Sequence, residues 1–215
     1  NMIRDMSVEE ATLYKKWVEM QTYKEKYDAS KVTKSNIWVP KDINNKEGTL
    51  KQLRDLVPVI KFAESERDVS EWLNLRLFCH TMEYEMAPGR MLRFTIQDDV
   101  TGKYLGAASL SSDVTTISVR DKWIGWSKKN KFDEGKLRCT SIASCIMSTQ
   151  PFGYNFLGGK LIATLLTSDI IRNIWKEKYN DVLVGLTTTS LYGPESMYNG
   201  IPYWKNIGAT AGKVY

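Results

Sequence analysis

The residues best suited to chemistry lie in a loop and helix start between Gln150 and Lys160. The segment reads Gln-Pro-Phe-Gly-Tyr-Asn-Phe-Leu-Gly-Gly-Lys, with a strand-like apolar run before it and a helix-like apolar run after it. The first N–H groups of a helix lack partners within the helix, and the helix dipole adds partial positive charge there. Glycines let the backbone approach a phosphate closely. The segment therefore predicts an anion site, and the alternative is a helix start whose small residues serve packing.

A second group of residues combines positive charge with aromatic rings. Lys128, Lys129 and Lys131 follow closely after Trp123 and Trp126. Basic side chains attract the phosphates of nucleic acids, and aromatic rings stack on bases. A net charge of +5 over 215 residues permits a nucleic-acid partner without requiring one. The alternative for this group is a solvated turn.

Metal sites and histidine-dependent catalysis have few candidate residues. His80 is the single histidine, and Cys79, Cys139 and Cys145 have no paired spacing. A metal site needs several ligands at suitable spacing, so we expect no metal. An odd number of cysteines favours a reducing compartment. The N-terminus shows no signal-peptide pattern, and no apolar run approaches the roughly 20 residues that span a membrane. We therefore expect a cytoplasmic protein with no membrane partner.

The first 88 residues show helical patterns. A Ser or Thr followed three residues later by Glu or Gln predicts helix starts at Ser7 and Thr49. The first helix is expected to run to about residue 27, and Pro58 should end or kink the second. A third helix is predicted over 68–86.

The remaining residues alternate between strand and helix patterns. Two strands over 91–97 and 104–110, joined by turn residues, predict a β-hairpin. The aromatic segment 120–126 is expected to be a loop or short strand. The later predictions are a strand over 137–147, a helix from the glycines to 168, a helix over 169–179, a strand over 182–188, a short helix over 195–204 and a last strand over 207–214. This order predicts an α/β (or α+β) protein, a mixed central sheet flanked by helices.

The order of elements resembles the Gcn5-related N-acetyltransferase fold. In that fold, a hairpin and a splayed strand precede a helix whose N-terminus holds the pyrophosphate of acyl-CoA. Gln150 and Gly153 match the acyl-CoA loop pattern, and Asn155 departs from its last position. The resemblance implies an acetyltransferase-like domain over 65–215 after a helical extension over 1–64. It also implies that acyl-CoA, or a related acyl donor, binds to Gln150, Gly153, Asn155, Gly158, Gly159 and Lys160.

Two further segments resemble the DruA family, named after a protein of the Druantia antiphage system. Arg120–Ser127 reads Arg-Asp-Lys-Trp-Ile-Gly-Trp-Ser and is similar to a signature of that family. Trp204–Gly212 resembles its closing segment, in which a Trp precedes Gly-Glu-Thr-Ala-Gly by a few residues. Gly89–Phe94 and Tyr104–Gly106 also fit the family's hairpin. The resemblance covers roughly residues 89–215 and implies a role in phage–host conflict that involves nucleic acid.

The end of the chain also resembles the phage Mom proteins, which modify adenine in DNA on an acetyltransferase-like fold. Those proteins close with Tyr, a few residues, Trp and then Gly, and here Tyr198 and Tyr203 precede Trp204. The Lys- and Asn-rich composition suits a phage or a low-GC host. A phage-encoded protein would act in the cytoplasm of the host cell.

For an acyltransferase, the resemblance implies roles for named side chains. Tyr198 or Tyr203 would be the acid for the leaving thiolate, and Glu195 or Asp113 a base acting through water. Backbone N–H groups of 141–147 would polarise the thioester carbonyl if the edge of that strand is open. The alternative for both tyrosines is a place in the core or in a cleft wall.

The acceptor would meet residues on the other side of the cleft. The expected substrate contacts are Arg120, Trp123, Trp126, Thr188 and Ser190. The alternative for Arg120 is a structural ion pair with Asp121 that fixes the loop. The hydroxyls near residue 188 have the alternative of ordinary strand-end and turn chemistry.

Three functions follow as hypotheses. The first is an acyltransferase that moves an acyl or related group to a nucleobase in DNA, as Mom proteins modify DNA, or to another amine. Its partners would be DNA and a small-molecule acyl donor. The second is a non-catalytic, DruA-like nucleic-acid-binding module that kept the fold and lost the cofactor. The third is a phage structural or accessory protein that uses this domain for interaction.

Overall fold

A computed structural model of the protein describes residues 7–26, 31–32, 36–80, 89–149, 158–189 and 196–209. Its centre is a five-stranded sheet in the order β1-β2-β3-β4-β5. The strands are β1 (Pro58–Phe62), β2 (Met91–Asp98), β3 (Tyr104–Ser112), β4 (Thr140–Ser148) and β5 (Gly185–Thr187). The first four are antiparallel neighbours, and β5 runs parallel to β4. The predicted class, a mixed α/β sheet flanked by helices, is confirmed.

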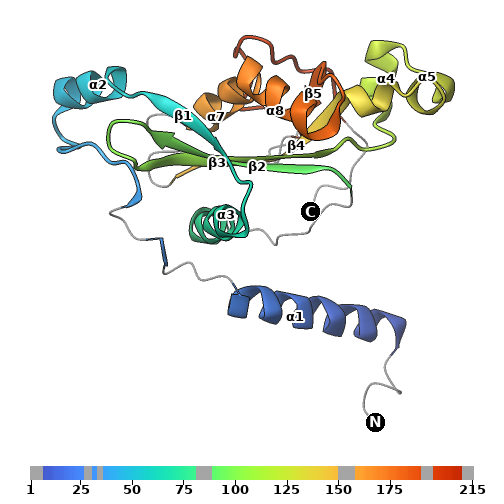
Figure 1. Ribbon diagram of the computed structural model, residues 1–215, viewed down its shortest axis with the longest axis horizontal. Helices are drawn as coiled ribbons and strands as arrows, with labels where there is room; N and C mark the ends of the chain where they lie inside the picture. Colours follow the sequence, from blue (N-terminus) through green and yellow to red (C-terminus); the bar gives the residue numbers. More distant parts are fainter. Residues whose placement is uncertain are drawn as a thin grey trace.

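Helices cover both faces of this sheet (Figure 1). Helix α3 (Glu66–Cys79) lies on one face, and α7 (Gly158–Leu166) and α8 (Asp169–Tyr179) lie on the other. Trp72 of α3 is fully buried and donates a hydrogen bond from its indole N–H to the Ala108 carbonyl at 3.0 Å. A Cβ at Gly106 would lie 2.5 Å from Ile162 Cδ1 of α7 and 2.4 Å from the Met147 carbonyl oxygen. Only glycine therefore allows this close packing of β3, β4 and α7.

The helix starts are set by side-chain caps. The capping box that we predicted for α1 (Val8–Lys26) is confirmed, with Glu10 N donating to Ser7 Oγ at 3.2 Å. Helix α2 (Lys46–Arg54) begins after Asn45, whose side chain accepts from Gly48 N at 2.8 Å, so the predicted start at Thr49 is wrong. Helix α3 begins after Ser65, which forms a capping box with Asp68. The start predicted at Asp68 is thus a few residues late, because Asp68 is the third helical residue.

The predicted hairpin of β2 and β3 is confirmed. Asp98 closes its turn, with the Asp98 carbonyl accepting from Gly102 N at 2.7 Å and the carboxylate from Thr101 N at 3.1 Å. Gly102 has φ +67°, a left-handed conformation that favours glycine. Burial pushes the pKa of Asp98 up, but hydrogen bonds from Thr101 and from the backbone outweigh it and leave that pKa below its usual value.

Strand β1 was not predicted from the sequence. Residues 58–62 pair along their whole length with β2, and Pro58 opens this edge strand, where a missing N–H is tolerated. The sheet therefore includes residues before the predicted boundary at 64/65. The division of the chain into two domains stays a prediction.

Residues 120–126 were predicted as a loop or short strand, and this is wrong. Helix α4 (Ser118–Ile124) occupies the segment, and Gly125 ends it at φ +79°. Helix α5 (Lys128–Phe132) follows after a capping box between Ser127 and Asn130. A short 3₁₀ helix, η4 (Lys136–Cys139), leads into β4. Figure 1 shows α4 and α5 together at the end of the sheet opposite α2.

The last predicted elements are shorter than expected. The strand predicted over 182–188 is present only over residues 185–187. Residues 196–203 form successive turns where a helix was predicted, and residues 207–209 form no strand. Residues 81–86 of the predicted third helix and 210–214 of the predicted last strand lie outside the described residues.

Candidate functional site

A network of buried charges joins α4 and α5 to the end of β3. Arg120 has 1% of its surface exposed and forms ion pairs with Asp113 at 2.8 Å and with Asp121 at 2.7 Å. Its guanidinium also donates to the Val114 carbonyl at 2.9 Å. Asp113 directly follows β3, so Arg120 ties α4 to the sheet.

Lys131 extends the network to α5. Its ammonium lies 2.6 Å from Asp121 Oδ2 and donates to the Thr115 carbonyl at 2.9 Å. Burial pushes the pKa of Asp121 up, but hydrogen bonds from Lys131 and Arg120 outweigh it, and that pKa lies below its usual value. With Asp113 included, two cations and two carboxylates meet here, so the network carries no net charge.

Strand β5 adds a hydroxyl to the same network. Thr187 donates from Oγ1 to Asp113 Oδ1 at 3.0 Å, and the neighbouring Thr188 donates to the Ala143 carbonyl at 3.1 Å. The other oxygen, Asp113 Oδ2, is buried without a hydrogen-bond partner among the described residues. Arg120 therefore forms the structural ion pair with Asp121 that we gave as the alternative to a contact with substrate. Contact of Arg120 or Thr188 with substrate stays a prediction.

The outer surface of these helices has a different character. We call residues 113–138 the α4–α5 corner. Trp123 is 57% exposed there, and Lys205 Nζ lies 5.4 Å from the centroid of its ring. Trp126 is half-buried, and its ring lies 5.4 Å from the Arg120 guanidinium carbon. Of the two predicted tryptophans, Trp123 is therefore the more accessible to a ligand.

Positive charge is concentrated on this corner. Residues 113–138 contain seven lysines and arginines against four acids, a net charge of +3 in a chain whose total is +5. Three exposed lysines have no ion-pair partner within the described part of the chain: Lys122, Lys128 and Lys129. Because the buried charges neutralise one another, the free lysines dominate the local field.

The predicted cofactor loop is described only in part. Gly158, Gly159 and Lys160 begin α7, whereas Gln150, Gly153 and Asn155 lie outside the described residues. A Cβ at Gly159 would lie 3.8 Å from the Tyr198 hydroxyl, so Tyr198 packs against the start of this helix.

The segment around Tyr198 is held on α7 by Trp204. The two rings lie 5.6 Å apart, and the Trp204 indole donates to the Ala163 carbonyl at 3.0 Å. Tyr203 is 92% exposed, and Glu195 and Ser190 lie outside the described residues. The structure thus places Tyr198, but not the other predicted catalytic residues, beside the expected cofactor helix.

Strand β4 pairs with β5 over only part of its length. Its pairing with β5 covers only Thr140–Ile142, so residues 143–148 have no β5 partner in the described part of the chain. Of the predicted residues 141–147, Ser141 and Ile142 are thus paired with β5, and the Ala143 carbonyl accepts from Thr188. The role of the backbone N–H groups of 141–147 in polarising a carbonyl stays a prediction.

Sequence reasoning missed two members of the buried network. Lys131 belongs to the basic run of the α4–α5 corner but is buried, and Thr187 lies 74 residues from the Asp113 that it contacts. No sequence spacing marks either contact.

Neither a membrane-spanning helix nor a metal-binding cluster is found in the described part of the chain. Within it, no helix is both long and apolar enough to cross a membrane. In those same residues, no cluster of three His, Cys, Asp or Glu side chains is placed to hold a metal ion. The cytoplasmic location and the lack of a metal stay predictions.

Comparison with known proteins identifies relatives of the chain. A family model described as Druantia protein DruA matches residues 12–214. The Druantia protein DruA of Escherichia coli (strain UMEA 4076-1) is 30% identical over 172 residues, which cover 72% of this chain and 42% of that relative. The chain thus spans less than half of the length of its curated relative.

The same comparisons bear on the other resemblances. No solved structure matches the chain. The family match extends the predicted DruA resemblance from residue 89 back to residue 12. The resemblances to Mom proteins and to acetyltransferases receive no support from these matches.

Proposed function

Because this chain belongs to the DruA family, we propose that it is a nucleic-acid-binding module of an antiphage protein and binds through the α4–α5 corner. One observation carries the proposal. An exposed indole, Trp123, lies on a corner whose lysines have no ion-pair partners among the described residues, above a neutral buried network. The DruA-like module is thereby favoured over the structural role, which predicts no such surface.

The chemistry of this surface suits a single strand. Lysine ammonium groups bind phosphates and release counterions, and an exposed aromatic ring stacks on an unpaired base. Lys205 beside Trp123 brings a positive charge next to the position of a stacked base. Bases within a duplex are already stacked on each other, so we expect tighter binding to single-stranded DNA than to duplex DNA.

The buried network has a positioning role in this proposal. Asp113, a base candidate from the sequence, accepts from Arg120 and Thr187 instead of facing solvent. Arg120 and Lys131 connect the end of β3 with α4 and α5, the two helices that carry Trp123 and the exposed lysines. A rigid platform lowers the ordering cost of binding.

The test is a salt titration of binding to a labelled single-stranded oligonucleotide, measured by fluorescence anisotropy. Wild-type affinity should fall steeply with salt. Lys128→Gln/Lys129→Gln should weaken binding and reduce the slope of log K against log salt by about 2. The matched control is Lys46→Gln/Lys51→Gln, the same change of charge on α2 at the opposite end of the sheet (Figure 1). Equal loss in both double variants would contradict binding at the corner.

A second candidate is acyl transfer to a nucleobase or another amine. The observation that favours it is Tyr198 beside Gly159 at the start of α7, the helix that follows β4 in the chain. Gly158, Gly159 and Lys160 would contact the phosphates of acyl-CoA, which supplies the activated acyl group. Tyr198 would give a proton to the leaving thiolate.

This candidate has its own test. Acetyl-CoA in excess should raise the melting temperature of wild type and of Tyr198→Phe alike. Mass analysis of nucleosides from cells that express the protein should show modified bases with wild type and unmodified bases with Tyr198→Phe. A melting temperature that does not respond to acetyl-CoA removes the acyltransferase from consideration and leaves the nucleic-acid proposal intact.

A further inference from the structure

The sheet face beneath α3 carries a strip of polar side chains. On β2, Arg93, Thr95 and Gln97 alternate with apolar residues, and Lys61 of β1 pairs with Thr95 across the strands. Thr95 and Gln97 are buried, although a sheet face covered by a helix normally buries apolar side chains. This part of the interface is therefore not simple core.

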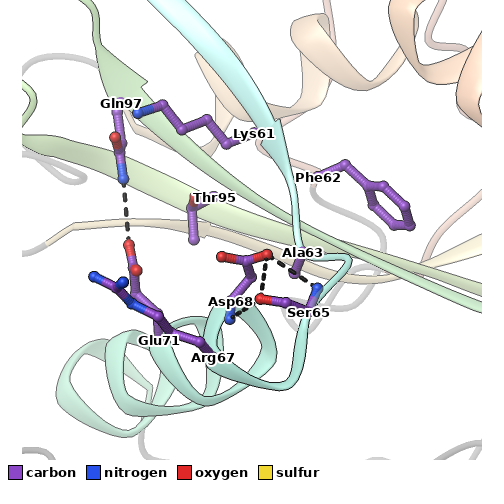
Figure 2. Close-up of a pocket in the computed structure, with 9 residues that line it drawn as sticks. All are labelled: Lys61, Phe62, Ala63, Ser65, Arg67, Asp68, Glu71, Thr95 and Gln97. Carbon is purple, nitrogen blue, oxygen red and sulfur yellow. Dashed lines mark hydrogen bonds between the residues drawn. The ribbon is translucent and has the colours of Figure 1, made fainter.

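A hollow of about 350 Å³ lies between this strip and the first turns of α3. Figure 2 shows Thr95 and Gln97 on the sheet side, with Arg67 and Glu71 on the helix side. A second hollow, of about 260 Å³, shares Arg67 and Glu71 and continues along α3 to Tyr104. We call the two together the α3 groove. Its volume falls in the range of about 300–1,000 Å³ that is usual for small-molecule sites.

The carboxylates of the α3 groove accept hydrogen bonds from uncharged donors. Glu71 Oε1 accepts from Gln97 Nε2 at 3.4 Å and from the Tyr104 hydroxyl. Burial raises the pKa of Tyr104, and its hydrogen bond to Glu71 and the charge of Glu71 raise it further, so the phenol stays a donor. Asp68 accepts from the Ser65 backbone N–H at 3.0 Å and from the Ser65 hydroxyl at 2.7 Å.

Hydrogen bonds from Ser65, and to a smaller degree the charge of Arg67, lower the pKa of Asp68, so Arg67 interacts with a carboxylate of the α3 groove. Lys61 and Arg67 are exposed, and neither forms an ion pair with any described residue. Figure 2 shows Lys61 on the sheet side and Arg67 on the helix side of the residues that line the hollow. Lys31 lines the second hollow and is likewise unpaired within the described residues. Three cations that form no ion pair among the described residues therefore lie around one concave surface, together with the carboxylates of Asp68 and Glu71.

We propose that the α3 groove binds a free mononucleotide. Arg67 and Lys61 can bind the oxygens of a phosphate monoester, since guanidinium and ammonium groups form charge-assisted hydrogen bonds to phosphate. Gln97, Thr95 and the free oxygen of Glu71 provide donors and acceptors for ribose hydroxyls or base edges. The site is separate from the α4–α5 corner, and no residue is shared between the two.

The test is calorimetric titration of the whole chain with each of the four ribonucleoside 5′-monophosphates, adenosine and inorganic phosphate. At least one mononucleotide should bind, and adenosine and inorganic phosphate should each bind at least about tenfold more weakly than AMP or the best nucleotide. Lys61→Gln and Arg67→Gln should each weaken nucleotide binding about tenfold. Both side chains are exposed, so these variants should keep the wild-type melting temperature.

The matched control is Lys128→Gln/Lys129→Gln on the α4–α5 corner, which should bind the nucleotide as wild type does. Binding that survives both groove substitutions, or that the corner variant abolishes, overturns the proposal. Lack of binding by all four nucleotides also overturns it, as does equal affinity for inorganic phosphate. None of these results changes the DNA-binding prediction for the corner, so the two proposals fail separately.

Discussion

The α4–α5 corner and the α3 groove place polar groups in the protein in opposite ways. In the corner, the charges of Arg120, Lys131, Asp113 and Asp121 are inside and paired, and the exposed Lys122, Lys128 and Lys129 form no ion pair among the described residues. In the groove, the buried polar residues are uncharged, and the cations at the rim form no ion pair among the described residues. A buried ion that lacks its partner is costly, so paired buried charges fix a structure, whereas unpaired cations at a surface are available to ligands.

Similar substitutions in the two regions should therefore have different effects on stability and on binding. Removal of a charge from the interior of the corner should change folding stability. Removal of a charge from the surface of the corner or the rim of the groove should change binding and leave stability nearly intact. The four predictions below test this distinction, from the largest effect to the smallest.

Arg120→Met should have the largest effect. It leaves Asp113 and Asp121 buried without their main partner and should lower the free energy of unfolding by about 3–5 kcal/mol. Urea denaturation measures the change. The control is Lys136→Gln, which breaks an exposed ion pair with Glu134 and should leave the free energy of unfolding nearly unchanged. If both variants lost similar amounts of unfolding free energy, the buried network would stabilise the fold no more than an exposed ion pair does.

Trp123→Ala should act on binding. Loss of the stacking surface should weaken single-stranded DNA binding by about 1–3 kcal/mol, with unfolding changed by less than about 0.5 kcal/mol. Anisotropy titration and urea denaturation of the same sample measure both quantities. Trp17→Ala on α1 is the matched control, because Trp17 is also about half exposed, at 51%. Equal weakening by the two substitutions would remove the special role of the corner.

Acid should destabilise the corner. Burial raises the pKa of Asp121, but hydrogen bonds from Lys131 and Arg120 leave it below the usual value. The ionised form is therefore favoured in the folded state, and its contribution is present above the ordinary Asp pKa of about 3.9 and is lost as pH falls below it. Melting temperatures measured from pH 6 downward should fall more steeply for wild type than for Asp121→Asn. Parallel curves would contradict this assignment.

Alkali should destabilise the groove, with the smallest effect. The pKa of Tyr104 is raised by burial and by Glu71, so the neutral phenol is favoured in the folded state. Its contribution is present below the ordinary Tyr pKa of about 10 and is lost as pH rises above it. Between pH 9 and 11, Tyr104→Phe should lose less stability than wild type. A variant that follows the wild-type curve would show that Tyr104 does not titrate with unfolding.

Sequence reasoning succeeded where one local pattern decides a structure. The Ser7 capping box and the hairpin of β2 and β3 are each set by residues close in the chain, and both are confirmed. The DruA resemblance also rested on short segments, and the family match confirms it. Asn45 and Ser65 were missed as helix caps because several polar residues precede each helix, and the sequence alone does not choose between them.

The short helices and strands could not be predicted from the periodicity of apolar residues in the sequence. Helix α4 has seven residues and β1 has five, too few to distinguish a helical from a strand-like period. Pro58 suggested only a helix end, although it also suits the start of an edge strand. Both elements exist because tertiary contacts hold them: β1 through its pairing with β2, and α4 through the pairing of Arg120 with Asp113.

The sequence by itself determined the class of the fold, the family and the position of the basic and aromatic residues, because these depend on composition and on neighbours in the chain. Only the tertiary structure decided which charges pair. Asp113 meets Thr187 from 74 residues away, and Glu71 meets Tyr104 from 33 residues away. Such contacts follow from strand register and helix packing. The difference between a lysine that supports the corner, Lys131, and one that is free to bind, Lys128, is therefore a property of the fold.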